Sequence, residues 1–190
     1  MDLSGFDFAA ALRCFEDRPA CPEVERLARY WLSLWRDGRL PSRGDFQPKA
    51  VGDLLPALCL FDVVPNRSVR CRLVGSRLVE AAGGVDITGR DWIEMTAPSD
   101  RRERMRRFSE VARGAIGRGM RVGRRQSGER QYAEEIMLPF DDVAPDGTRQ
   151  VLLFISWTPS LYDPTLTGLE RNRGLLLRFA LTPLAAGEAA

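Results

Sequence analysis

The stretch from Asp86 to Trp157 decides which fold this chain can adopt. It opens with Asp86-Ile87-Thr88-Gly89-Arg90-Asp91-Trp92-Ile93-Glu94-Met95 and continues through Pro98-Ser99-Asp100-Arg101. A run with helical periodicity follows, and then three segments of strand character at residues 120–126, 131–140 and 150–157. Turns that contain glycine, such as Asp146-Gly147, separate the later segments. This order predicts short helical turns, one longer helix and three antiparallel strands.

The longer helix is expected from Asp100 to about Arg113, with Ser99 as its N-cap. Its apolar side chains recur at helical spacing, and Phe108 lies at their centre. Arginines fill the opposite side of this helix, but no aromatic residues interleave with them to stack on bases. We therefore interpret the arginine face as solvated and expect no nucleic-acid partner, which agrees with a net charge of only +2.

Upstream, Pro22 is expected to open an amphipathic helix, because proline fits the first helical turn. Its apolar stripe contains two tryptophans and comprises Val24, Leu27, Trp31 and Trp35. Such a stripe packs either against the protein's own core or, because tryptophan is enriched at interface anchors, against a second copy. We expect a homodimer with these four residues in the interface.

Two strands are expected at residues 58–63 and 69–75, joined by a turn at Pro65-Asn66-Arg67-Ser68. A tight turn there places Cys59 opposite Val74 and Cys71 opposite Asp62, too far apart for a disulfide. Residues 175–181 are apolar enough to dock as a strand or as a short helix, and the sequence does not decide between the two.

The strands at 120–126 and 131–140 carry two opposite charges within apolar patterns. Matching their apolar residues places Arg124 opposite Glu134. This pair is either a ligand anchor or a structural ion pair, and both interpretations stay open at this point. In the last strand, we expect the inward side chains to be those of Val151, Leu153, Ile155 and Trp157.

The Gly89-Arg90 segment followed by Pro98-Ser99-Asp100-Arg101 resembles the lead into the long helix of PAS sensor domains, which also have an Asp-Gly turn between later strands. Leu40-Pro41-Ser42-Arg43 and Leu54-Leu55-Pro56-Ala57-Leu58 resemble a stand-alone bacterial PAS-like family of unassigned role. The resemblance covers residues 26 to 158. It implies an α+β domain with a five-stranded antiparallel sheet, helices packed on one face and an N-terminal helical extension. The expected division is an extension at 1–21, the PAS-like domain at 22–158 and a C-terminal extension at 159–190.

By this resemblance, the chain is a non-enzymatic sensory module that binds a small ligand, a signalling partner protein, or both. The resemblance places a pocket between the sheet and the helices. Its expected lining is Phe61, Leu73, Trp92, Phe108, Arg124, Glu134, Ile136 and Trp157. Two other functions remain open: a small isomerase or lyase that uses Glu134 as its base, and an oligomerisation adaptor that binds no ligand.

Composition narrows the chemistry further. The chain has no histidine, which excludes a histidine-ligated haem and a Ser-His-Asp arrangement. It also lacks the cysteine-containing helical segment of flavin-binding light sensors, so we expect no haem or flavin cofactor. None of the four cysteines forms a CxxC pair, so no metal site is expected. Neither a signal peptide nor a run of 18 apolar residues is visible, so we expect a cytoplasmic protein with no membrane span.

Overall fold

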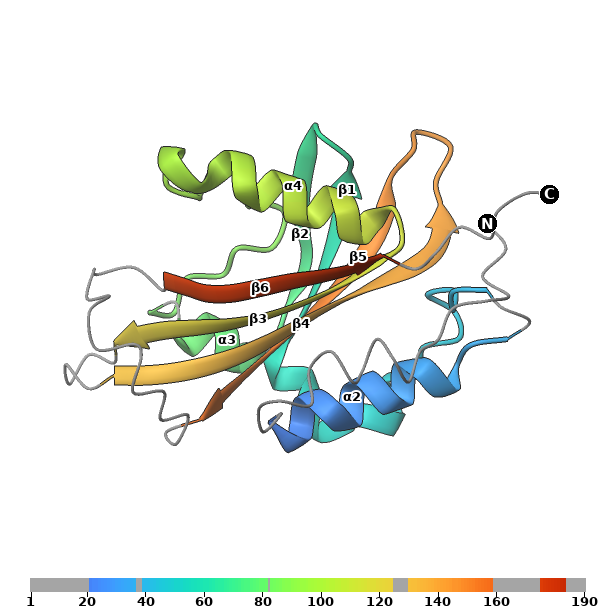
Figure 1. Cartoon of the computed structure of the whole chain (residues 1–190), viewed down its shortest axis with the longest axis horizontal. Coiled ribbons are helices and arrows are strands. Elements are labelled where there is room, and N and C mark those ends of the chain that lie inside the picture. Colours follow the sequence, from blue (N-terminus) through green and yellow to red (C-terminus); the bar gives the residue numbers. More distant parts are fainter. Residues whose placement is uncertain (1–20, 37–38, 82, 125–129, 159–174, 184–190) are drawn as a thin grey trace.

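The computed structural model of the protein describes residues 21–36, 39–81, 83–124, 130–158 and 175–183. Its centre is an antiparallel sheet with the strand order β2-β1-β5-β4-β3-β6 (Figure 1). The strands are β1 (Leu58–Val64), β2 (Ser68–Val74), β3 (Ala115–Arg124), β4 (Arg130–Val143), β5 (Arg149–Thr158) and β6 (Leu175–Pro183). The expected α+β fold with a five-stranded antiparallel sheet is confirmed. The segment at 175–183 adds a sixth strand beside β3, which decides between the two forms expected for residues 175–181.

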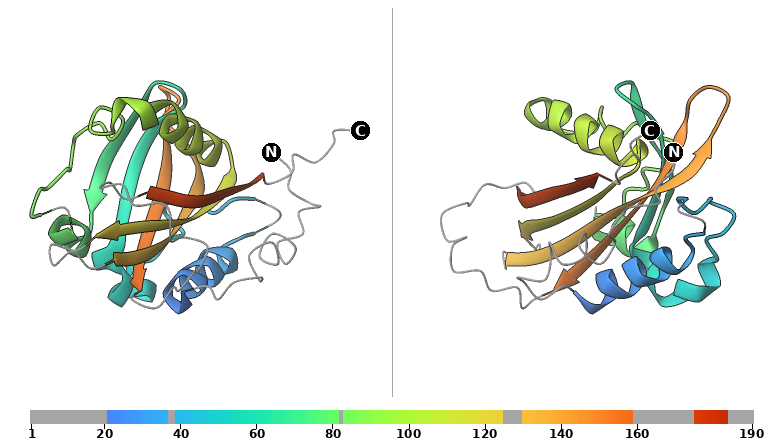
Figure 2. Two further views of the ribbon diagram at one scale, coloured as in Figure 1. Left: turned by 60° about the vertical axis from the view of Figure 1, so that its left-hand side comes forward. Right: turned by 45° about the vertical axis from the view of Figure 1, so that its right-hand side comes forward.

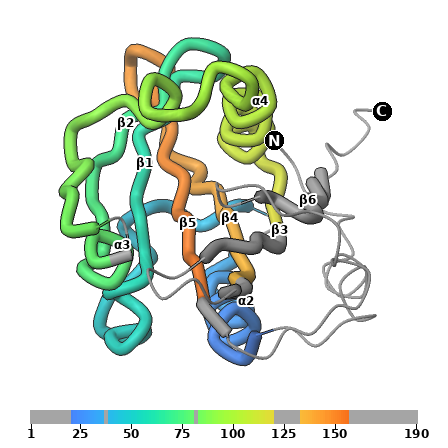
Figure 3. The backbone as a smooth tube through the Cα atoms, turned by 90° about the vertical axis from the view of Figure 1, so that its left-hand side faces the viewer, coloured from blue at the N-terminus to red at the C-terminus, as the bar shows by residue number. Residues whose placement is uncertain are grey.

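Helices cover both faces of this sheet (Figures 1 and 2). The helical elements are α2 (Pro22–Ser33), η1 (Pro48–Ala57), α3 (Ser76–Ala81), η2 (Pro98–Asp100) and α4 (Arg101–Ala112). Helix α4 packs on one face with α3, and α2 packs on the other with η1. Figure 3 shows α4 and α2 on opposite sides of the strands. The two faces therefore carry two separate apolar cores, called here the α4 face and the α2 face.

Helix α4 begins close to where the sequence predicted, although Ser99 does not cap it. Ser99 lies in the 3-10 turn η2, and its hydroxyl donates to a carboxylate oxygen of Asp100 at 2.8 Å. On the inner side of α4, Ser109 accepts a hydrogen bond at 2.9 Å from the backbone N–H of Asn66. Asn66 has a positive φ of 62°, which asparagine tolerates in a turn. The predicted turn between β1 and β2 is thus tied directly to α4.

The stripe on α2 belongs to the protein's own core. Val24, Leu27 and Trp31 are at most 2% exposed within a single chain, because they pack on the α2 face of the sheet. The Trp31 indole donates to the carbonyl of Pro139 at 3.1 Å, and its ring meets Trp35 edge-on at 5.6 Å. Trp35 is half-buried against the same cluster. The expectation that this stripe forms a dimer interface is therefore wrong, since a second copy cannot reach side chains already buried by the sheet.

A β-bulge changes the predicted pairing of β1 with β2. Cys59 lies opposite Val74 as predicted, but Cys71 lies opposite Phe61 instead of Asp62. The shift occurs between Leu60 and Phe61, where Arg72 is the extra residue of β2. A one-residue shift moves every later side chain to the other face, so Val69 and Cys71 face α4 while Leu73 does not. Strand β2 is an edge strand, so a side chain on its uncovered side is open to solvent, and Leu73 is 52% exposed.

The predicted register of β3 on β4 is wrong by four residues. Arg124 lies opposite Arg130, and Glu134 lies opposite Met120 on one side and Ser156 on the other. The apolar pattern of β3 alone fits several registers, because it alternates with glycine and arginine over its whole length. The partner that Glu134 takes from β3 is Arg118 instead of Arg124.

The residues predicted to face inward on β4 and those predicted to face inward on β5 lie on opposite faces of the sheet. Residues opposite each other in an antiparallel pair point to the same side of the sheet. Ile136 lies opposite Phe154, and both belong to the α2 face. Val151 and Leu153 belong to the α4 face. Because both faces of the sheet are covered, β4 is apolar on both sides, and alternation does not say which side meets which helix.

Candidate functional site

Three of the predicted ligand-binding residues meet beneath α4. Phe61 on β1 contacts Phe108 on α4, with ring centroids 4.9 Å apart, and Trp92, with centroids 5.7 Å apart. The backbone N–H of Trp92 donates to the carbonyl of Val69 on β2 at 2.7 Å, which holds the preceding loop against the edge of the sheet. The guanidinium of Arg104 lies 5.2 Å from the centre of the Trp92 ring. These contacts form an aromatic cluster with one wall on the sheet and one on α4.

The other predicted lining residues do not join this cluster. Leu73 points to solvent for the reason given above, and Glu134 and Ile136 lie on the α2 face. The side chains of Arg124 and Trp157 lie outside the part of the structure that is described. The six described residues among those predicted to line one pocket are therefore divided between the two sides of the sheet.

Glu135 is a site residue that the sequence reasoning missed. It is completely buried, and its register neighbours are Gly119 on β3 and Ile155 on β5. It shares the α4 face with Met137, which lies opposite Gly117. Burying a carboxylate is costly unless it has polar partners, so Glu135 marks a polar position on a face that is otherwise mostly apolar. The signal was present in the Glu134-Glu135 dipeptide, because successive residues of a strand must point to opposite faces.

A second buried polar group lies on the α2 face, at the start of α2. One carboxylate oxygen of Glu134 accepts from the guanidinium of Arg118, and the other accepts from the backbone N–H of Cys21. The Cys21 sulfur lies within hydrogen-bond distance of the hydroxyl of Ser156, at 2.9 Å, and its thiol can donate to the carboxylate of Glu23 at 3.1 Å. The group fixes the first turn of α2 onto β3, β4 and β5. Because both oxygens of Glu134 are engaged by the chain itself, the arrangement favours a structural ion pair.

The titration behaviour of this group fits a structural role as well. Burial raises the pKa of the Cys21 thiol to about 11, with the nearby carboxylates of Glu23 and Glu134 acting in the same direction. The hydrogen bond from that thiol lowers the pKa of Glu23. Cys21 is therefore a protonated thiol at neutral pH, whereas a nucleophilic cysteine needs a lowered pKa.

In the described segments, no group of three or more His, Cys, Asp or Glu side chains lies close enough together to hold a metal ion. Cys21, Cys59 and Cys71 are free thiols. None of the helices in those segments combines the length and the apolar character needed to cross a membrane.

Comparison with known proteins agrees with this architecture. The family model described as "PAS domain" matches the chain over residues 20–153. No curated protein matches the sequence. The match covers well over half of the chain and includes α2, β1, β2, α4, β3 and β4 with the first half of β5, which together build both faces of the sheet. The chain therefore belongs to the PAS domain family, and its general role is that of a sensory or regulatory module.

Proposed function

We propose that this PAS domain binds a small ligand on the α4 face of its sheet and performs no chemistry on it. The observation that carries the proposal is the position of Glu135, a completely buried carboxylate beneath α4 on the same face as an aromatic cluster. Ligand sites are mostly apolar, with a small number of polar groups that fix orientation. Phe61, Trp92 and Phe108 supply the apolar surface, and Glu135 supplies an acceptor for a ligand that carries N–H or O–H groups.

The backbone of β3 supports this location. Gly117 and Gly119 are buried at the α4-face positions next to Met137 and Glu135, and a glycine brings no side chain to fill that surface. A ligand on this face could therefore approach the backbone of β3 closely. A ligand held there would touch β3, β4 and α4 at once, so its binding would be felt by elements far apart in the sequence.

An enzyme that uses a carboxylate base is the second candidate, because a buried carboxylate in an apolar environment is also a general-base arrangement. Glu135 would be the base of such an enzyme instead of Glu134, whose two carboxylate oxygens are engaged by Arg118 and Cys21. The chain offers no histidine to work with it as a partner acid or base. The free thiols agree with a cytoplasmic location, where thiols stay reduced. A second copy or a signalling partner would contact surfaces other than the apolar stripe of α2, which is buried within one chain.

Native mass spectrometry of the purified protein, followed by identification of any released mass, tests the proposal. We expect wild type to retain a small molecule, and Glu135→Gln and Trp92→Ala to lose it. Leu73→Ala is the matched control. Leu73 is an apolar residue of the β1–β2 hairpin, which also carries Phe61, but its side chain is exposed to solvent. The proposal is refuted if both site variants retain the molecule as well as wild type does. It is equally refuted if wild type is empty and no member of a metabolite library raises its melting temperature. Conversion of the retained molecule on incubation would support the enzyme instead.

A further inference from the structure

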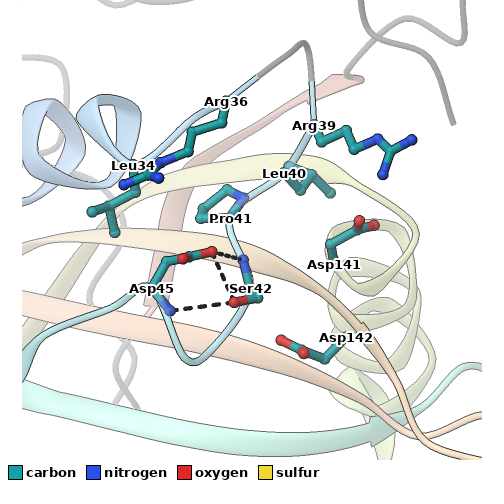
Figure 4. Close-up of a pocket in the computed structure, with 9 residues that line it drawn as sticks. All are labelled: Leu34, Arg36, Arg39, Leu40, Pro41, Ser42, Asp45, Asp141 and Asp142. Carbon is teal, nitrogen blue, oxygen red and sulfur yellow. Dashed lines mark hydrogen bonds between the residues drawn. The ribbon is translucent and has the colours of Figure 1, made fainter.

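A second candidate site lies outside both cores, at the point where α2 ends. An open cleft of ≈ 290 Å³ is bounded by the end of α2, the segment at 39–45 and the end of β4 (Figure 4). Its lining residues are Leu34, Arg36, Arg39, Leu40, Pro41, Ser42, Asp45, Asp141 and Asp142. Neither the aromatic cluster beneath α4 nor Glu135 contributes to it.

The segment that carries one wall of the cleft is firmly held. The carbonyl of Pro41 accepts a hydrogen bond at 3.0 Å from the backbone N–H of Asp141. Asp45 accepts two hydrogen bonds from Ser42, at 2.9 Å from its backbone N–H and at 2.8 Å from its hydroxyl. The Arg43 guanidinium lies 5.5 Å from the centre of the Phe46 ring, which is part of the α2-face core. The cleft is therefore preformed, which lowers the entropic cost of binding.

The charges of the lining are of both signs, and one carboxylate and two guanidinium groups, those of Asp141, Arg36 and Arg39, form no hydrogen bond or ion pair among the described residues. The hydrogen bonds from Ser42 lower the pKa of Asp45, and the carboxylate of Asp142 accepts from the backbone N–H of Arg43. The carboxylate of Asp141 and the guanidinium of Arg39 have no partner among the described residues. Figure 4 shows both groups at the same end of the cleft, on opposite walls. Leu34, Leu40 and Pro41 add apolar surface nearby.

We propose that this cleft binds a small zwitterion, namely a basic α-amino acid. The ligand's carboxylate pairs with Arg39 and its α-ammonium group pairs with Asp141, while its aliphatic stem rests on Leu40 and Pro41. A guanidinium and a carboxylate both form charge-assisted hydrogen bonds, which are stronger than neutral ones. The lining has three carboxylates and two guanidinium groups, so a second cation on the ligand complements it better than a neutral or acidic side chain.

Isothermal titration calorimetry with four probes tests this assignment: lysine, norleucine, glutamate, and cadaverine, which lacks the carboxylate. We expect the affinity to fall in the order lysine, norleucine, glutamate. We also expect lysine to bind more tightly than cadaverine, because cadaverine cannot engage Arg39. Absence of binding by lysine at millimolar concentration overturns the proposal, and so does cadaverine binding as tightly as lysine.

Variants locate the binding. Asp141→Asn and Arg39→Gln each remove one charge from an exposed side chain, and each should weaken lysine binding by about tenfold or more. Asp146→Asn, in the turn that follows β4 and outside the cleft, and Arg102→Gln, on the exposed side of α4, are matched controls that should bind like wild type. Glu135→Gln should also bind lysine normally, which separates this site from the one beneath α4. Unchanged affinity in both cleft variants overturns the proposal.

Discussion

Replacing Arg118 with methionine tests whether the buried pair on the α2 face holds the molecule together. The Arg118 and Glu134 side chains are 13% and 3% exposed, so the change leaves a carboxylate buried without its cation. Breaking a buried pair by removing one partner costs about 3–5 kcal/mol. We expect Arg118→Met to lower the free energy of unfolding by that amount.

The double variant Arg118→Met with Glu134→Gln should recover part of this loss. The glutamine carries no charge, and its side-chain oxygen can still accept from the backbone N–H of Cys21. The cost should then fall to about 1–2 kcal/mol, close to that of a changed buried hydrogen bond. Urea unfolding of the wild type, both single variants and the double variant, followed by tryptophan fluorescence and circular dichroism, gives the coupling energy.

Arg124→Met is the matched control for that cycle. The register places Arg124 opposite Arg130, six positions along β3 from Arg118, so its replacement should leave the buried pair intact and cost no more than about 0.5 kcal/mol. If Arg118→Met costs as little as this control, or if the two single changes add with no coupling, the pair is not the structural element described here.

Three further predictions follow from the packing and the charges. Trp31→Ala should cost about 3–5 kcal/mol without releasing monomers from any dimer, as thermal melts and light scattering would reveal, because the side chain is fully buried within one chain. Phe108→Ala should destabilise by a similar amount and Leu73→Ala by less than about 0.5 kcal/mol; equal losses would contradict the bulge. Hydrogen bonds from Arg106 hold the pKa of Glu103 at about 2, below its ordinary 4.5, so its stabilising contribution is present above pH 4.5 and lost as the pH falls toward 2. Glu103→Gln should therefore flatten the acid side of the stability profile; an unchanged profile between these pH values would refute the pairing.

Local chemistry made several elements predictable. The 3.6-residue spacing of apolar side chains marked α2 and α4, and turn residues such as Asn66 and Gly147 marked the ends of strands. The order of these elements was enough to indicate the PAS fold. The membership of Phe61 and Phe108 in one cluster followed from the same order, because that fold lays its long helix over the first strand.

The sequence could not decide features that depend on how distant segments meet. Alternation reveals that a strand has two faces, but only the covering helices distinguish them, so Glu134 and Ile136 were assigned to the wrong side. A single extra residue, Arg72, reversed Leu73, and no local signal in the strand marks such a bulge.

What the sequence determined by itself is the set of elements and their order, because periodicity and turn chemistry act over a few residues. Tertiary structure alone decided the register, the face on which Glu135 is buried, and the placement of Arg39 and Asp141 in one cleft. These two residues are about a hundred positions apart in the chain, and they line the same cleft because the carbonyl of Pro41 accepts a hydrogen bond from the backbone at the end of β4. Contacts of that kind depend on how the whole sheet packs between its two helical layers, and this packing involves residues far apart in the sequence, so no short segment determines it.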